Sequence, residues 1–153
     1  MISISVSTNR SKYWSRFCEA LALNSVELEV IFVGPVSALP RDPLPVPARF
    51  IDVPEEICPA QCWEMGARAA RGELLGLSCD DFVFSPGFLD AVAVEAGKFS
   101  HDMDMISARY VDNGRESLSE QHMASGEDMP LLPLAGFYTT ESYHRLGGID
   151  RRF

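Results

Sequence analysis

The sequence of 153 residues contains no apolar run close to the roughly 18 residues that a membrane-spanning helix needs. It also lacks a basic leader followed by an apolar core, so we predict no signal peptide and a cytoplasmic location. Positive charge is scarce, because 13 Lys and Arg residues stand against 22 Asp and Glu residues, a net charge of −9. This balance argues against nucleic-acid or anionic-membrane partners. It still allows a small anionic ligand held by backbone N–H groups and a cation.

Cysteine is scarce too, and the four cysteines form no C-x-x-C pair. Because no histidine stands at ligand spacing from them, the sequence does not predict a zinc site. No G-x-G-x-x-G motif follows the first apolar segment, which argues against a dinucleotide-binding domain. We interpret the cysteines as free thiols in a reducing compartment; they are Cys18, Cys58, Cys62 and Cys79.

The chain has the length of one domain, and its 46% hydrophobic and 23% charged residues are ordinary for a globular protein. Apolar or β-branched segments of strand length alternate with segments of helical periodicity. Predicted strands cover 2–6, 28–33, 49–53, 74–79, 103–111 and 134–138, and predicted helices cover 11–24, 59–72, 85–97 and a short stretch from Thr140. A Pro-rich loop at 35–47 and a surface loop at 113–133 interrupt this order. The alternation predicts an α/β fold with a mostly parallel sheet flanked by helices.

In such sheets, ligands bind at the carboxyl ends of the strands, so the residues that follow strands are the candidates. They are Ser7 to Arg10, Gly34, Asp52 and the pair Asp80–Asp81. Adjacent carboxylates repel unless a cation lies between them, and Mg²⁺ is bound by one or two carboxylates together with phosphate oxygens. The pair therefore favours a divalent cation beside a phosphate ligand. A helix cap or a solvated turn is the alternative interpretation.

Four segments, in order along the whole chain, resemble glycosyltransferase family 2, the inverting enzymes of the GT-A fold. The opening SISVSTNR is similar to the first strand and turn of that family, and Glu64-x-Gly66-x-x-x-Ala70-x-Gly72-Glu73 is similar to its helix motif. Asp80-Asp81 with Pro86 and Phe88-Leu89 is similar to its acidic cluster. Gly136-Phe137 followed by Leu146-Gly147-Gly148-Ile149-Asp150 is similar to its final glycine motif.

The resemblance implies a Rossmann-like GT-A domain that moves a sugar from a nucleotide diphosphate of UDP or GDP type to a hydroxyl of a saccharide or another acceptor, with inversion. It implies Mn²⁺ or Mg²⁺ as cofactor, bound by Asp81 and Asp80, with Asp80 beside the ribose or the metal. By position it assigns the nucleotide-sugar to Ser7, Thr8, Asn9, Arg10, Gly34, Asp52, Asp80, Gly147 and Gly148. A base would deprotonate the acceptor, and the metal would neutralise the leaving diphosphate.

The sequence departs from this family at several positions. Cys79 and Gly34 stand where acidic residues are usual, and Trp63-Glu64 replaces an Arg-Asn pair. The family's base follows the glycine motif, but this sequence ends at Phe153, so the base is not identified and Asp150 is the candidate left. The pair Glu127-Asp128 precedes Gly136 and is interpreted as a solvated loop. A catalytically inactive nucleotide- or partner-binding module is therefore the alternative function. We expect a further segment or a second subunit, as in a homo-oligomer, to cover the apolar Phe153.

Overall fold

The computed structural model describes residues 1–35, 43–101, 104–107, 110–112, 115–117 and 136–149. Its main sheet has six strands in the order β3-β2-β1-β4-β8-β5. These strands are β1 (Ile2–Ser7), β2 (Leu28–Gly34), β3 (Ala48–Asp52), β4 (Leu74–Cys79), β5 (Met105–Ser107) and β8 (Gly136–Thr139). The first four are parallel to one another, whereas β8 is antiparallel to both β4 and β5. The predicted fold class, a mostly parallel α/β sheet flanked by helices, is confirmed.

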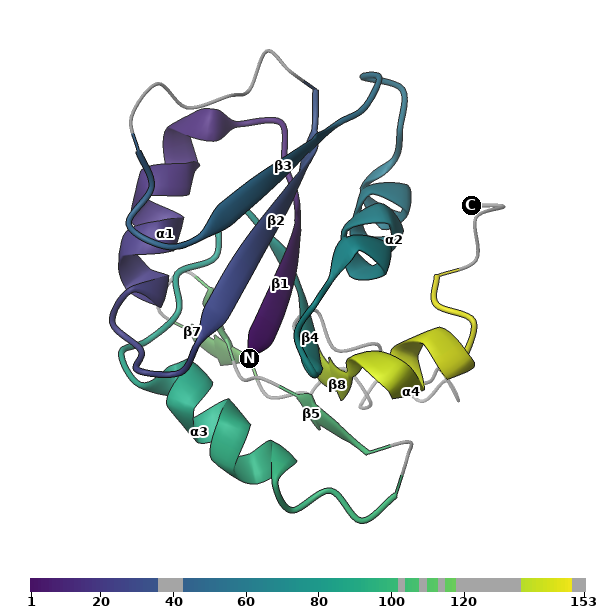
Figure 1. Ribbon diagram of the computed structural model, residues 1–153. Coiled ribbons are helices and arrows are strands. Elements are labelled where there is room, and N and C mark those ends of the chain that lie inside the picture. The colour runs from purple at the N-terminus through teal and green to yellow at the C-terminus, as the bar shows by residue number, and fades with distance from the viewer. Residues whose placement is uncertain (36–42, 102–103, 108–109, 113–114, 118–135, 150–153) are drawn as a thin grey trace.

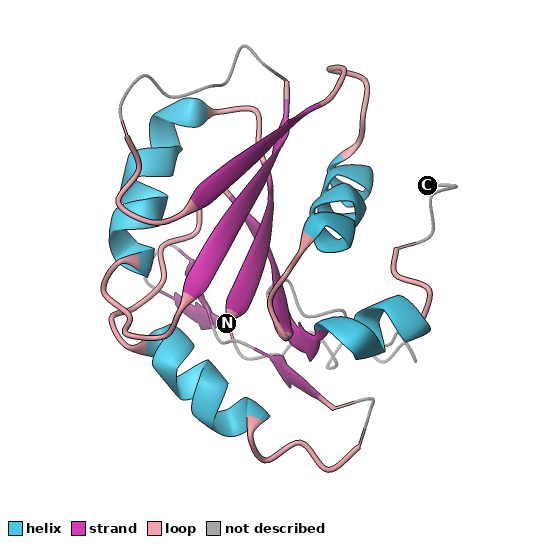
Figure 2. Ribbon diagram, in the orientation of Figure 1, coloured by secondary structure: helices cyan, strands magenta, loops and turns pink. Residues whose placement is uncertain are grey.

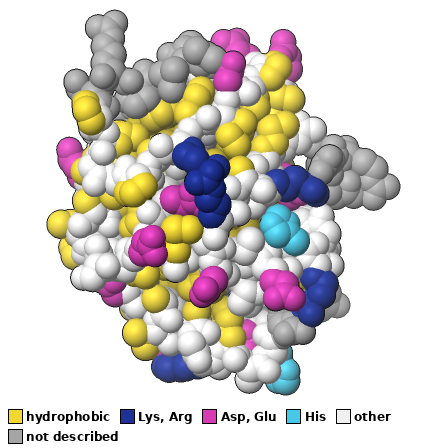
Figure 3. Space-filling view, in the orientation of Figure 1, with side chains coloured by type: hydrophobic (Ala, Val, Ile, Leu, Met, Phe, Trp, Pro, Cys, Tyr) yellow, Lys and Arg dark blue, Asp and Glu magenta, His cyan; other side chains and the backbone are white. Residues whose placement is uncertain are grey.

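Helices cover both faces of this sheet, with α1 and α3 on one side and α2 and α4 on the other (Figures 1 and 2). Their bounds are α1 (Trp14–Leu21), preceded by a 3-10 turn at Ser11–Tyr13, then α2 (Pro59–Ala69), α3 (Phe88–Ala96) and α4 (Thr140–Arg145). No helix within the described ranges is long and apolar enough to cross a membrane. On the face shown in Figure 3, the visible Lys and Arg side chains lie apart, with Asp and Glu side chains among them.

The alternating sequence of β1 divides its side chains between two different layers. Ile2, Ile4 and Val6 are buried in the core shared with α1 and α3, where Trp14 stacks on Phe32 at 3.9 Å. The serines between them are buried as well, on the side of α2. Ser5 Oγ donates to the Trp63 carbonyl at 3.0 Å, and Gly66 of α2 lies so close to Ser5 that a Cβ there would overlap the hydroxyl. Small polar residues therefore let α2 pack close to the centre of the sheet.

A buried carboxylate joins β2 to the end of α2. Glu29 Oε1 accepts from Ser3 Oγ at 2.7 Å and from the Arg71 backbone N–H at 2.9 Å, and Oε2 accepts from Arg49 Nε at 3.0 Å. Burial alone raises the pKa of Glu29, but the hydrogen bonds from Ser3 and Arg71 and the Arg49 charge together hold it below its ordinary value. These bonds fix where α2 ends, and β4 begins shortly afterwards.

Several expected boundaries are wrong. The predicted strand 103–111 is divided into β5 and β6 (Tyr110–Asp112), and β6 pairs with β7 (Arg115–Ser117) in a separate two-stranded sheet. The segment predicted as a loop at 113–133 therefore contains the strand β7. Residues 113–114 and 118–135 lie outside the described residues, and so do residues 36–42 of the Pro-rich loop. Helix α3 begins at Phe88 after Gly87, whose φ of 72° only glycine adopts readily, and not at the expected residue 85. Helix α4 begins at Thr140, and Thr139 caps it by accepting from the Ser142 N–H.

Candidate functional site

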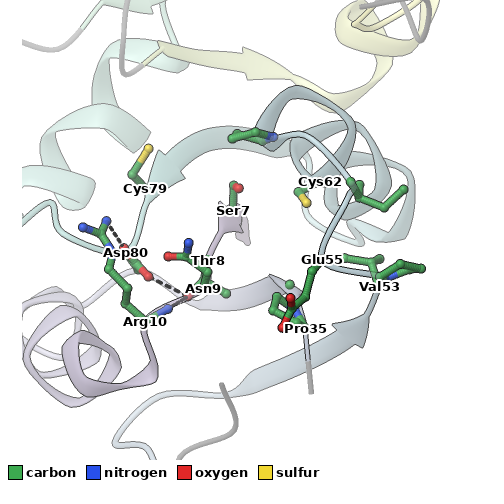
Figure 4. A pocket seen from close by; sticks show the side chains of 14 residues that line it. Ser7, Thr8, Asn9, Arg10, Pro35, Val53, Glu55, Cys62, Cys79 and Asp80 are labelled. Atoms are coloured by element: carbon green, nitrogen blue, oxygen red, sulfur yellow. Dashed lines mark hydrogen bonds and ion pairs between the residues drawn. The ribbon is translucent and has the colours of Figure 1, made fainter. Parts of the chain in front are cut away.

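The carboxyl ends of β1, β2, β3 and β4 surround a pocket of about 740 Å³, which the start of α2 completes (Figure 4). Parallel strands bring their ends to one edge of the sheet, so residues far apart in sequence meet there. The lining residues are Ser7, Thr8, Asn9, Arg10, Gly34, Pro35, Val53, Pro54, Glu55, Ile57, Pro59, Cys62, Cys79 and Asp80. Gly34 leaves no room for a side chain, because a Cβ would overlap the Thr8 carbonyl oxygen.

A chain of buried hydrogen bonds fixes Asp80 at one end of this pocket. Asp80 is 2% exposed, and its Oδ2 accepts from Thr8 Oγ1 at 2.6 Å. The same Thr8 oxygen accepts from Trp14 Nε1 at 2.6 Å, which links the site to the aromatic core below α1. A buried carboxylate is stable only when its oxygens are paired, and here both are: Oδ2 by Thr8 and Oδ1 by Arg10 at 2.7 Å.

Arg10 also reaches the second carboxylate of the pair. Its Nη2 lies 2.9 Å from Asp81 Oδ2, so one guanidinium nitrogen bridges the two acidic side chains. The Arg10 and Asp81 side chains are 42% and 50% exposed, in contrast to the buried Asp80. The hydrogen bond to Asp81, together with Asp80, raises the pKa of Arg10 above its ordinary value. The two ion pairs of Arg10 therefore differ in exposure: Asp80 is buried, whereas Asp81 is open to solvent at the mouth of the pocket.

Two cysteines line the pocket as neutral thiols. Burial, reinforced by the charges of Asp81 and Asp80, raises the pKa of Cys79 to about 11, and burial also raises the pKa of Cys62. A thiol with such a pKa is protonated at neutral pH and is a poor nucleophile or metal ligand. Over the part of the chain that the structure describes, no group of three His, Cys, Asp or Glu side chains could hold a metal ion. A cation here would need oxygen atoms from a ligand.

The structure brings most of the predicted nucleotide residues together. Ser7, Thr8, Asn9, Arg10, Gly34 and Asp80 all line the pocket. Asp81 lines an adjoining hollow of about 240 Å³, which shares Asp80 with the larger pocket. Asp52 is exposed at the end of β3 and does not line the pocket; Val53 and Glu55, just beyond it, do. Sequence reasoning considered only the residue at the strand end, so it missed the loop that follows.

Gly147 and Gly148 do not line the pocket, and Gly148 lies beside the α2 residue Glu64. Both have positive φ, of 92° and 68°. Glu64 is 2% exposed, and its Oε2 accepts from the Tyr143 hydroxyl at 2.9 Å and from the Ile149 N–H at 3.0 Å. Arg68 Nε lies 2.6 Å from Oε1 as an ion pair, in a geometry that leaves Oε1 without a hydrogen bond. Asp150, the candidate base, lies outside the described residues.

The fold is similar to those of several solved structures. The crystal structure of residues 1–349 of S. aureus TarS in complex with UDP-GlcNAc matches with a TM-score of 0.71 and 19% identity, over 95% of this chain and 47% of that one. The mannosyltransferase PcManGT from Pyrobaculum calidifontis, in complex with GDP-Man and Mn²⁺, matches with a TM-score of 0.65 and 16% identity, over 96% and 46%. This chain thus spans about half the length of these structures. No protein-family model and no curated protein sequence matches it.

Proposed function

We propose that this chain binds the nucleotide-diphosphate part of a sugar donor in the pocket at the strand ends and supports transfer of the sugar to a hydroxyl acceptor, such as a saccharide. One observation carries the proposal. Thr8 and Arg10 both hydrogen-bond to the buried Asp80, and this charged group lies where four parallel strands end. The likeness to structures holding UDP-GlcNAc and GDP-Man adds support from the fold. Transfer with inversion, as in family 2, is part of the proposal.

The charge of the pocket supports a divalent cation as cofactor, Mn²⁺ or Mg²⁺. Arg10 is the one cationic side chain lining the described pocket, whereas Glu55 and Asp80 line it and Asp81 adjoins it. One positive and three negative side chains would repel a diphosphate. A divalent cation bound between the carboxylate and phosphate oxygens would offset this excess of negative charge.

The two carboxylates differ in what they can offer to a cation. Both oxygens of Asp80 are engaged, by Thr8 and Arg10, and the side chain is 1% exposed. Asp81 is half exposed, and Arg10 contacts its Oδ2. We therefore assign the direct metal contact to Asp81, with the diphosphate as the second source of oxygen ligands. When bound, the cation would neutralise charge on the leaving diphosphate. Asp80 holds Thr8 and Arg10 in place.

Calorimetric titration of the chain with UDP and GDP, with and without Mn²⁺, tests this proposal. We expect metal-dependent binding of at least one nucleotide and its loss in Asp81→Asn. Asp52→Asn is the matched control, because Asp52 carries the same group at the end of another strand of the sheet but lies outside the pocket. Nucleotide binding that is unaffected by Asp81→Asn would contradict the assignment.

Incubation with the corresponding sugar nucleotides then separates an enzyme from a binding module. Release or transfer of the sugar, with the anomeric configuration of the product read by NMR, would establish activity and inversion. Binding without turnover would favour the inactive module. The catalytic base is not among the groups assigned here, and Asp150 remains the prediction from the sequence.

A further inference from the structure

The end of the pocket farthest from Asp80 contains a second carboxylate. Glu55 lies in the loop between β3 and α2, lines the pocket and is exposed, and it forms no hydrogen bond or ion pair with any other described residue. Figure 4 shows its side chain on the same side of the pocket as Pro35, away from the Arg10–Asp80 pair. Because no described cation accompanies it, this end would repel a phosphate group.

The sheet order gives the separation between the two ends. Asp80 follows β4 and Glu55 follows β3, and the order β4-β1-β2-β3 places three strand spacings between them. At about 4.8 Å per spacing this is roughly 14 Å. A nucleoside diphosphate extends over this scale from its diphosphate to the far edge of its base, whereas the ribose adjoins the phosphate directly. If the diphosphate lies beside Asp80 and Asp81, Glu55 is within reach of the base and not of the ribose.

The walls near Glu55 suit a flat aromatic ring. Pro35, Val53 and Ile57 line this part of the pocket, and Val53 is buried. Apolar walls with one polar group at the edge are the usual arrangement for a small-molecule site, in which the polar group supplies specificity. Glu55 is the charged side chain that this end presents to the edge of a base.

The chemistry of a carboxylate selects among the bases. It offers two acceptor oxygens side by side and no donor. The Watson–Crick edge of guanine presents two adjacent donors, N1–H and the 2-amino group, which match both oxygens. Uracil presents a single donor between two carbonyl acceptors, and adenine and cytosine each place an acceptor ring nitrogen beside their amino group. In each of these three bases, an acceptor atom would face a carboxylate oxygen, which is unfavourable because neither atom can donate a hydrogen bond.

We propose that Glu55 is the base-selecting residue of this chain and that the nucleotide it binds is a guanosine diphosphate. This inference rests on the proposed function, because it requires a nucleotide in the pocket. It adds the identity of the base and a residue that the resemblance did not assign.

Titration of the full chain with GDP, inosine diphosphate and UDP, each with Mn²⁺, tests the inference. Inosine diphosphate keeps N1–H but lacks the 2-amino group. We expect GDP to bind about tenfold more tightly than UDP, with inosine diphosphate between them, since a hydrogen bond to a charged group at an exposed site has about this effect. Glu55→Gln should remove the preference for GDP over inosine diphosphate. Glu56→Gln, a change of the same kind at the exposed neighbour outside the pocket, should leave it intact.

Three results would overturn the inference, and they have different meanings. UDP binding as tightly as GDP would refute guanine selection while leaving the proposed function standing. Equal weakening of all three nucleotides by Glu55→Gln would show that Glu55 contacts a part that they share, such as the ribose, and not the base. Binding of none of them would refute the proposed function, and the inference with it.

Discussion

Arg10 Nη2 lies 2.9 Å from Asp81 Oδ2, in contact with the carboxylate that we assign to a metal ion. The guanidinium therefore balances part of the negative charge that would attract a cation. Unlike a surface ion pair between two mobile side chains, this one is anchored, because Arg10 also bonds the buried Asp80 at 2.7 Å. Metal affinity in the absence of nucleotide should be limited by Arg10.

Replacement of Arg10 by Ala should strengthen Mn²⁺ binding to the nucleotide-free chain on the order of tenfold, since one nearby positive charge is removed from the pair. The amount of free Mn²⁺ measured by electron paramagnetic resonance checks this. Lys98→Ala changes the net charge equally just beyond the end of helix α3, outside the pocket, and should have little effect. Unchanged or weaker Mn²⁺ binding in Arg10→Ala would contradict competition at Asp81.

Thr8→Val should destabilise the chain by about 2–3 kcal/mol, because it leaves a buried oxygen of Asp80 and the Trp14 indole N–H without their shared partner. Urea unfolding followed by tryptophan fluorescence measures this loss. Thr8→Ser keeps the hydroxyl and should restore most of the stability. A Val variant as stable as the original chain would show that the two hydrogen bonds of the Thr8 hydroxyl contribute nothing.

Stability should fall in acid through Glu29. Its pKa is lower in the folded chain than the ordinary value of 4.5, so its bonds to Ser3, Arg71 and Arg49 stabilise the fold fully above pH 4.5. This contribution is lost as the pH falls through the lower, folded-state pKa. The free energy of unfolding, measured in urea from pH 7 to pH 3, should therefore decline less steeply in Glu29→Gln. An equally steep decline in that variant would assign the acid sensitivity to other groups.

Gly148→Ala should destabilise the chain by roughly 1–3 kcal/mol, because its φ of 68° disfavours a side chain and the new Cβ would overlap Glu64 Oε2. Gly147→Ala is a matched control, with a φ of 92° but no atom near the added Cβ, so it should show the backbone effect alone. Thermal unfolding of both variants measures the difference. Equal destabilisation would show that contact with Glu64 contributes nothing.

Most of the fold could be predicted from the sequence, because the patterns that specify strands and helices are local. The mostly apolar segment at 28–33 becomes the fully buried strand β2, and 74–79 becomes β4. The prediction failed at 103–111, where the residues form two short strands of different sheets. Which strands β5 and β6 pair with decides where each one begins and ends, and the sequence of this one segment does not specify those partners.

The sequence by itself also determined that Thr8, Arg10, Gly34 and Asp80 stand at or just after strand ends, and parallel topology then brings them to one edge of the sheet. Only the tertiary structure decided which of these groups touch. Arg10 meets Asp80 across 70 residues, and Glu64 meets Ile149 across 85. Such contacts depend on side-chain direction and on the exact path of loops. For that reason Glu55 came to line the pocket, while Asp52, three residues earlier, did not.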